Sequence, residues 1–294
     1  MSPNQFIVPR DGVKLARRSW PVGQSFGTVV LVHGIAEHTG RYEHVAAQLN
    51  SWGWSVESYD QRGHGQSEGP RGGLTQQDDL VRDLASVVQV ARQKTTGPLL
   101  LLGHSLGGLV VGSYAAGFTA PSVEPWLLPV DGLVMVSPAL DAPVTLFQLG
   151  LMSTVGRLFP DMTVSTGFDP VAICSDPAVV EAYRQDPLVH DRISPRLARF
   201  ILEAGAATIA CAQRWTIPTL VMYAGADGIV NPQGSANFVD RAPRDLVQGS
   251  VFPALAHEIL NEPEQAQVFA VLKPWLDDQF TVWQRAQHRS LVAA

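Results

Sequence analysis

The run Leu99–Gly108, LLLLGHSLGG, is the stretch of sequence that decides the fold. Its four leucines are uniformly apolar, which is typical of a short strand buried on both faces. They lead directly into the pattern G-x-S-x-G at residues 103–107, and the apolar stretch Leu109–Ala116 that follows is suited to a helix. A serine between a buried strand and a helix is the context that the nucleophile-elbow motif requires.

The glycines of this motif have a physical reason. A serine on a sharp strand-to-helix turn has a strained backbone, and small residues two positions before and after it avoid steric clashes. Gly103 and Gly107 meet this requirement around Ser105. The first N–H groups of the helix lack helical partners, so we expect the Leu106 N–H to stabilise an oxyanion formed at Ser105.

Apolar runs with strand character recur on both sides of the elbow and alternate with amphipathic stretches. Between two of these runs, apolar residues at positions 80, 84, 87, 88 and 91 have helical spacing. The pattern predicts an α/β protein with a mainly parallel central sheet flanked by helices. The predicted strands are Thr28–Val32, Trp54–Tyr59, Leu99–Leu102, Leu133–Val136, Thr219–Tyr223 and a weaker Leu246–Phe252.

A long insertion separates two of the predicted strands. About eighty residues lie between the runs at 133–136 and 219–223, far more than a crossover between parallel strands needs. We therefore predict a helical cap at residues 141–211, and an α/β core formed by residues 1–140 and 212–294. Prolines spaced through the insertion predict that its helices are short.

The C-terminal region predicts one more helix. It has an apolar face formed by Val268, Val271, Leu272, Trp275 and Leu276. Pro274 interrupts this pattern, so we expect a kink or an early end near Lys273.

The composition excludes several classes of function. The formal net charge is -6, and 21 scattered Lys and Arg residues do not form the basic surface that nucleic acids require. Cys174 and Cys211 are too few for a disulfide framework or a Cys-based zinc site. The N-terminus lacks the apolar segment of a secretory signal, and no apolar run approaches the ~20 residues of a membrane helix. We expect a soluble, cytoplasmic protein.

A serine nucleophile needs a general base and an acid that orients this base. In hydrolases with this elbow the chain order is nucleophile, acid, base, so the base is expected late in the sequence. His257, in a loop after the last predicted strand, fits better than His190 in the cap or His288 near the C-terminus. For the acid, Asp227 directly follows a predicted strand, and Asp141 remains the second choice.

A second oxyanion donor is expected from the loop after an early strand. His33-Gly34-Ile35 follows the first predicted strand, so we predict the N–H of Ile35. Glu37 and His38 lack a third metal ligand at useful spacing and are interpreted as loop-shaping residues. His64, between two glycines, is interpreted as structural. No phosphate-binding loop is present, and we expect neither a metal nor an organic cofactor.

Six motifs occur in a fixed order along the chain: HGIAEHTGRY (33–42), DQRGHGQS (60–67), GHSLGG (103–108), DPL (186–188), GAD (225–227) and AHE (256–258). Together they resemble the monoacylglycerol lipase and lysophospholipase group of the α/β-hydrolase superfamily, which is similar to the serine aminopeptidase-like hydrolases. The resemblance spans nearly the whole chain. It implies the α/β-hydrolase fold, a catalytic triad of Ser105, Asp227 and His257, and an oxyanion hole formed by the amides of Ile35 and Leu106.

Two residues depart from the pattern of this group. Ala36 stands where glycine is usual, and Leu106 stands where methionine is frequent. The first change is expected to stiffen the oxyanion loop and the second to reshape the pocket floor. Both therefore bear on acyl-chain preference.

The resemblance implies a serine carboxylic-ester hydrolase that cleaves monoacylglycerols or related single-chain lipid esters through an acyl-enzyme. The cap run Leu146–Phe159 is strongly apolar, so we expect Phe147, Leu151 and Leu158 to bind the acyl chain and the cap to contact lipid aggregates or a membrane surface. Alternatives are a lysophospholipase or short-chain carboxylesterase, a serine peptidase or amidase, and a non-catalytic binding protein on the same fold. The cap run offers no acidic residue for a substrate amine, and the complete set of predicted catalytic residues argues against a loss of catalysis.

Overall fold

The computed structural model describes residues 5–143, 159 and 162–293. Eight strands form one sheet in the order β1-β2-β4-β3-β5-β6-β9-β10. The pairings from β4 through β3, β5, β6 and β9 to β10 are parallel, which confirms the predicted α/β architecture. The strands of this sheet are β1 Gln5–Ile7, β2 Leu15–Trp20, β3 Gly27–Val32, β4 Trp54–Tyr59, β5 Leu99–His104, β6 Gly132–Val136, β9 Thr219–Ala224 and β10 Val247–Phe252.

The sequence did not predict β1 and β2, which form an antiparallel edge of the sheet. β2 contains Arg17 and Arg18 and therefore lacks an apolar run. Its register places Arg17 opposite the end of β4, where the guanidinium pairs with the buried carboxylate of Glu57. A contact between strands forty residues apart thus makes a charged strand compatible with burial.

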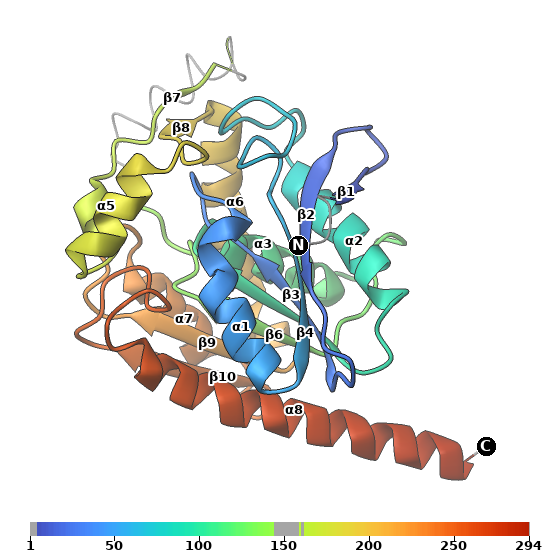
Figure 1. The fold of residues 1–294 in the computed structure, drawn as a ribbon. Helices are drawn as coiled ribbons and strands as arrows, with labels where there is room; N and C mark the ends of the chain where they lie inside the picture. The colour runs from blue at the N-terminus through green and yellow to red at the C-terminus, as the bar shows by residue number, and fades with distance from the viewer. Residues whose placement is uncertain (1–4, 144–158, 160–161, 294) are drawn as a thin grey trace.

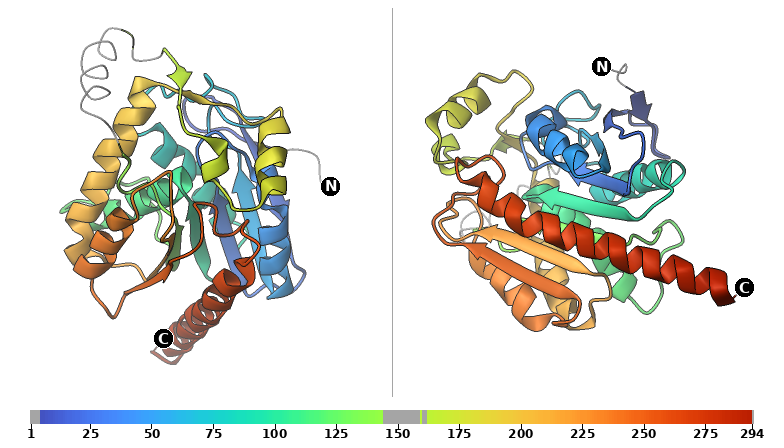
Figure 2. Two further views of the ribbon diagram at one scale, coloured as in Figure 1. Left: turned by 90° about the vertical axis from the view of Figure 1, so that its left-hand side faces the viewer. Right: turned by 60° about the horizontal axis from the view of Figure 1, so that its bottom comes forward.

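Helices cover both faces of the sheet (Figures 1 and 2). Buried side chains of α2, α3, α6 and α7 share one apolar cluster on one face, and those of α1 and α8 share another cluster on the opposite face. The helices are α1 Glu43–Ser51, α2 Asp79–Arg92, α3 Leu106–Ala116, α5 Pro177–Gln185, α6 Pro195–Cys211, α7 Pro232–Arg241 and α8 Gln265–Ala293. Short 3-10 helices cover Thr39–Tyr42, Gly117–Thr119, Pro170–Ala172 and Ala212–Arg214.

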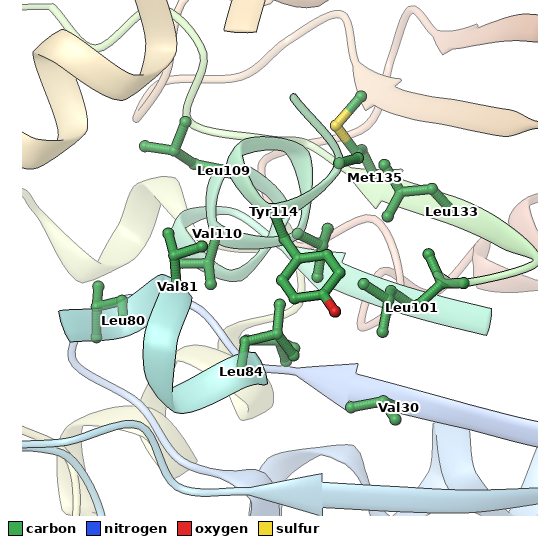
Figure 3. Close-up of a cluster of buried hydrophobic side chains, with 14 of the residues drawn as sticks. Val30, Leu80, Val81, Leu84, Leu101, Leu109, Val110, Tyr114, Leu133 and Met135 are labelled. Carbon is green, nitrogen blue, oxygen red and sulfur yellow. The ribbon is translucent and has the colours of Figure 1, made fainter. Parts of the chain in front are cut away.

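The larger cluster fixes the helix that follows the elbow. Figure 3 shows Tyr114 of α3 surrounded by Leu84 of α2 and Leu101 of β5. All three side chains are fully buried, and each contributes on the order of 2 kcal/mol through burial. The Tyr114 hydroxyl donates to the carbonyl of Leu128 at 2.7 Å. These contacts hold the C-terminal half of α3 between α2 and β5.

The segment between β6 and β9 contains α5, α6 and a small antiparallel sheet of β7 Val164–Ser165 and β8 Arg192–Ile193. Helices α5 and α6 each begin with an N-cap followed by proline: Asp176 accepts from Ala178 N–H, and Ser194 accepts from Leu197 N–H. This combination is a strong helix start.

Helix α5 has 9 residues, as expected for a short cap helix, but α6 has 17. The expectation of short helices is wrong for α6, because its apolar face packs on α3 and shares the larger core cluster. The β7–β8 pair was also not predicted. The cap boundaries 141–211 remain a prediction.

Helix α8 continues for nineteen residues past Pro274. Of the two outcomes expected near Lys273, the early end is therefore wrong, and the kink stays a prediction. Proline removes one helical hydrogen bond, but Val268, Leu272 and Leu276 on the same face are almost fully buried. This packing outweighs the local cost of the proline. The helix crosses the sheet and extends beyond it (Figures 1 and 2).

Candidate active site

Ser105 lies between β5 and α3 with φ 54° and ψ −116°, a left-handed backbone conformation that is strained for a residue with a side chain. The flanking glycines permit this turn. A Cβ on Gly103 would lie 2.2 Å from the carbonyl oxygen of Gly107, and a Cβ on Gly107 would lie 2.1 Å from that of Val32. Ser105 N–H donates to Val136 O at 2.9 Å. The elbow thus has the geometry that its motif predicts.

Asp227 and His257 meet next to the elbow. Asp227 follows β9, and His257 lies in the loop between β10 and α8. His257 Nδ1 is 2.7 Å from Asp227 Oδ2, and Asp227 Oδ1 accepts from the N–H groups of Ile229 and Val230 at 2.9 and 3.0 Å. Burial raises the pKa of Asp227, but the hydrogen bond and charge of His257 and these two N–H donors outweigh burial and lower it.

The alternative acid and base residues lie elsewhere. Asp141 Oδ2 accepts from Asn231 Nδ2 at 2.7 Å, at the start of α7. His190 N–H donates to the carbonyl of Ala36, and His288 lies on the exposed C-terminal part of α8. Of the two acids considered from the sequence, Asp227 is the one that is hydrogen-bonded to His257.

The predicted oxyanion loop lies against the elbow. A Cβ on Gly34 would be 3.2 Å from Ser105 Cβ, so the two backbones approach closely. Gly34 N–H is already bonded to Glu37 Oε1 at 2.5 Å, which leaves Ile35 N–H as the next candidate donor on this loop. Leu106 is the first residue of α3, where no helical carbonyl accepts its N–H.

Ala36 has φ 66° and is fully buried. This left-handed conformation explains why the family pattern prefers glycine at the position, since a Cβ there is strained. The departure noted in the sequence therefore falls on a backbone position that carries strain, directly beside the candidate donor Ile35.

A buried ion-pair network that sequence reasoning missed adjoins both loops. Arg41 Nη1 is 2.6 Å from Glu37 Oε2, and Arg41 also makes a two-pronged pair with Glu258 at 2.6 and 2.7 Å. The charge of Arg41 lowers the pKa of Glu37 well below its ordinary value, although burial acts in the opposite direction. The motifs HGIAEHTGRY and AHE contain all three residues. Arg41 and Glu37 are only four positions apart, but the pairing of Arg41 with Glu258 spans 217 positions, and no local pattern reveals it.

His104, the residue before the elbow serine, also belongs to this neighbourhood. Its ring lies 4.9 Å from that of His257. The hydroxyl of Tyr42 donates to Glu37 Oε1 at 2.7 Å and lies 2.8 Å from His104 Nδ1. Burial lowers the pKa of His104, but the hydrogen bond and the charge of Glu37 outweigh burial and raise it.

His64 is buried, and its Nδ1 lies 3.0 Å from the carbonyl of Arg62. Its ring contacts those of His33 and His190, at centroid distances of 5.5 and 4.6 Å. Burial lowers the pKa of all three imidazoles, that of His190 to about 4. A neutral, packed histidine agrees with the structural role predicted for His64.

Some of the residues predicted from the sequence lie outside the part of the chain that the structure describes. The predicted acyl-binding residues Phe147, Leu151 and Leu158 lie outside them. Within residues 5–143, 159 and 162–293, no group of three or more His, Cys, Asp or Glu side chains is arranged to hold a metal ion. None of the helices in this part of the chain combines the length and apolar character needed to cross a bilayer.

The sheet order, the strained serine and the aspartate–histidine pair together define an α/β hydrolase. The family model described as serine aminopeptidase, S33 (Hydrolase_4) matches residues 23–264. The chain belongs to this family, which confirms the resemblance seen in the sequence.

Individual relatives agree with this assignment. The chain is 34% identical over 270 residues to a monoacylglycerol lipase of Mycolicibacterium smegmatis, covering 90% of this chain and 93% of the relative. The crystal structure of Paleococcus ferrophilus monoacylglycerol lipase is 33% identical, with a TM-score of 0.80 over 90% of this chain and 99% of that chain. A soluble variant of monoglyceride lipase from Saccharomyces cerevisiae, solved with a substrate analogue, is 25% identical, with a TM-score of 0.81 over 94% of both chains.

Proposed function

We propose that this chain hydrolyses monoacylglycerols, with Ser105, Asp227 and His257 as its catalytic triad. The observation that carries the proposal is the 2.7 Å contact between Asp227 and His257, in a chain whose elbow serine has φ 54°. The relatives named monoacylglycerol lipase support the substrate.

The proposed mechanism follows the roles of these groups. His257 Nε2 takes the proton of the Ser105 hydroxyl, and the oxygen attacks the ester carbonyl while the N–H groups of Ile35 and Leu106 stabilise the oxyanion. The bond to glycerol breaks, and His257 returns its proton to the departing oxygen. Water then attacks the acyl-enzyme, its proton passes to His257, and the fatty acid leaves as the Ser105 hydroxyl reforms. Asp227 fixes the tautomer of His257 throughout.

The test is a substrate panel with wild type and Ser105→Ala. Hydrolysis is measured on monoacylglycerols with acyl chains of about 8 to 18 carbons, on lysophosphatidylcholine, on a short-chain nitrophenyl ester and on an aminoacyl anilide. We expect the highest kcat/KM on a monoacylglycerol and no turnover by Ser105→Ala. Preference for lysophosphatidylcholine or for the anilide would replace the proposal with the lysophospholipase or the peptidase alternative. Absence of fluorophosphonate labelling would indicate a non-catalytic protein.

We also propose that the cap, residues 141–211, binds the acyl chain through Phe147, Leu151 and Leu158 and contacts lipid aggregates. Four apolar side chains on described parts of this segment, Phe159, Met162, Val164 and Val171, are 48 to 59% exposed, which supports a lipid-facing surface. In Leu151→Asp and Phe147→Ser, turnover of long esters should fall while that of acetyl esters is retained. Equal losses at every chain length would assign these residues to packing. The expected cytoplasmic location remains a prediction.

A further inference from the structure

The segment 173–190, which we name the strap, contains α5 and is hydrogen-bonded at its start to the loop that carries His257. The carboxylate of Glu262 makes the main connection: it accepts from Ser175 N–H at 2.8 Å and from the Ser175 hydroxyl. The same carboxylate accepts from Ala256 N–H at 3.3 Å. Glu262 is only 1% exposed, so water does not compete for these bonds. One buried side chain therefore joins the strap to the residue that precedes His257.

A backbone hydrogen bond reinforces this junction. Glu258 N–H donates to the carbonyl of Ile173 at 2.7 Å. The strap is thus bonded directly to the residue after His257 and, through Glu262, to the residue before it. The position of the imidazole depends on both sides of the loop being held.

The other end of the strap is bonded to the oxyanion loop. His38 Nε2 lies 2.8 Å from Asp186 Oδ2, and His190 N–H donates to the carbonyl of Ala36 at 3.1 Å. Ala36 directly follows Ile35, the candidate oxyanion donor, so this bond holds the Ala36–Glu37 peptide unit, two units after the one that carries the Ile35 N–H.

The contact between His38 and Asp186 has a defined direction. His38 Nδ1 accepts from Gly40 N–H at 3.1 Å, so Nε2 carries the proton and donates it to the carboxylate. Asp186 Oδ1 accepts from Leu188 N–H at 2.8 Å. Burial raises the pKa of Asp186, but the hydrogen bonds from His38 and Leu188 outweigh burial and lower it.

Packing brings the strap to the third catalytic loop as well. Ile173, Val180 and Tyr183 form a small buried cluster of their own, separate from the two large clusters of the sheet. Ile229 packs against it, and Ile229 N–H donates to Asp227 Oδ1. Because this apolar cluster is small, the polar bonds at the two ends contribute a large share of what fixes the strap.

We propose that the strap is a positioning element that holds the oxyanion loop and the His257 loop in register, acting through Glu262 and Asp186. Neither carboxylate touches the reacting atoms in this proposal, which rests on the proposed serine-hydrolase function. The strap would then affect kcat, while other residues of the cap select the substrate. A misplacement of about 1 Å far from the chemistry costs on the order of 100-fold in rate, so loosening either end should be measurable.

The experiment measures kcat and KM for Glu262→Ala and Asp186→Asn on a short and a long ester. We expect kcat to fall about 10- to 100-fold on both esters, with KM nearly unchanged and the ratio of the two rates retained. Glu262→Gln keeps a side-chain oxygen that can accept from the N–H groups of Ser175 and Ala256, and its amide can still bond to the Ser175 hydroxyl. This variant should therefore recover most of the loss of kcat. Ser175→Ala added to Glu262→Ala should cost little more, since the two changes remove one interaction.

Asp131→Ala is the matched control. Asp131 also accepts a backbone N–H, from Leu99, and pairs with Arg92, but it lies at the opposite end of β5. The Asp131→Ala variant should therefore be less stable than the wild type but have the same kcat. A loss of kcat in this control equal to that in Glu262→Ala would reduce the effect to general destabilisation.

Two further results would overturn the proposal: unchanged kcat in folded Glu262→Ala and Asp186→Asn, or an effect on KM that grows with chain length, which would make the strap a substrate contact. If Glu262→Ala does not fold by circular dichroism, Asp186→Asn and Ser175→Ala carry the test. The rate of fluorophosphonate labelling of Ser105 is measured in parallel. If the wild type cleaves none of the esters, only the proposed function is refuted. Slower labelling of Ser105 in the variants than in the wild type would still support the positioning role of the strap.

Discussion

Asp227 and His257 lie thirty residues apart in sequence, yet their side chains meet at 2.7 Å. The cause is the pairing of β9 with β10, in which Ala224 is opposite Phe252. Because the two strands are parallel, both loops leave the same edge of the sheet. Ala226 N–H also donates to Leu255 O at 3.2 Å, so the loops are bonded to each other before either side chain is placed.

Asp227→Asn should lower kcat by on the order of 10⁴, because the amide cannot hold His257 in the tautomer that accepts the serine proton. Asp141→Asn is the control, since Asp141 is bonded to Asn231 instead, and it should keep most activity. Steady-state kinetics on one ester decides between them. The reverse order of losses would assign the acid to Asp141.

Ser105→Ala should abolish fluorophosphonate labelling and lower kcat by on the order of 10⁶, as for other triad serines. Labelling is read by intact-mass spectrometry, and ester turnover is measured on the same sample. A variant that is still labelled at another serine, with full turnover, would refute the assignment of the nucleophile.

Gly107→Ala should destabilise the fold by about 2 kcal/mol or more, because the added Cβ would meet two carbonyl oxygens at 2.1 and 2.5 Å. Gly23→Ala is the matched control: no atom lies within 4 Å of its Cβ position, and its effect should stay within about 0.5 kcal/mol. Urea unfolding measures both. Similar values for the two variants would contradict the close approach at the elbow.

The unfolding free energy should depend on pH through His190. Burial and the nearby charge of Arg71 lower its pKa to about 4 in the folded chain, from the ordinary 6.5. The unfolded chain therefore binds more protons between these values, and the stability present above about pH 6.5 is lost as the pH falls toward 4. The difference in unfolding free energy between wild type and His190→Gln should shrink as the pH is lowered from about 7.5 to about 4.5. A constant difference in urea unfolding would contradict the shift.

Arg41→Met should destabilise the fold by about 3–5 kcal/mol, because it leaves Glu37 and Glu258 buried without their cation. Adding Glu258→Gln should restore part of the loss, since it removes one of the unpaired charges. A double-mutant cycle in urea measures this coupling. Strict additivity would show that the two groups do not interact.

Local sequence patterns predicted the elements that carry the elbow and the loops after β9 and β10. Ser105 and Asp227 follow buried apolar strands, whereas β10 before His257 is mostly exposed and gave a weaker signal. Local patterns did not predict β2, whose Arg17 is acceptable only because its side chain pairs with Glu57, or the pair between Arg41 and Glu258, which exists only after folding. The possible early end of α8 near Pro274 was wrong, since the local cost of proline is visible in the sequence and the burial of Leu272 and Leu276 is not. Long-range contacts account for these differences.

The length of α8 has a consequence for how the molecule opens. Up to Leu276 the helix is buried on the sheet, and Phe280 still stacks on Phe26, whereas residues 284–288 are exposed on every side. An isolated stretch of helix is marginal in water. Amide hydrogens in the last turns should therefore exchange rapidly, because local fraying of the helix end costs little free energy. Amide hydrogens before Leu276 should exchange only through global unfolding. A single helix should thus contain both weakly and strongly protected amides.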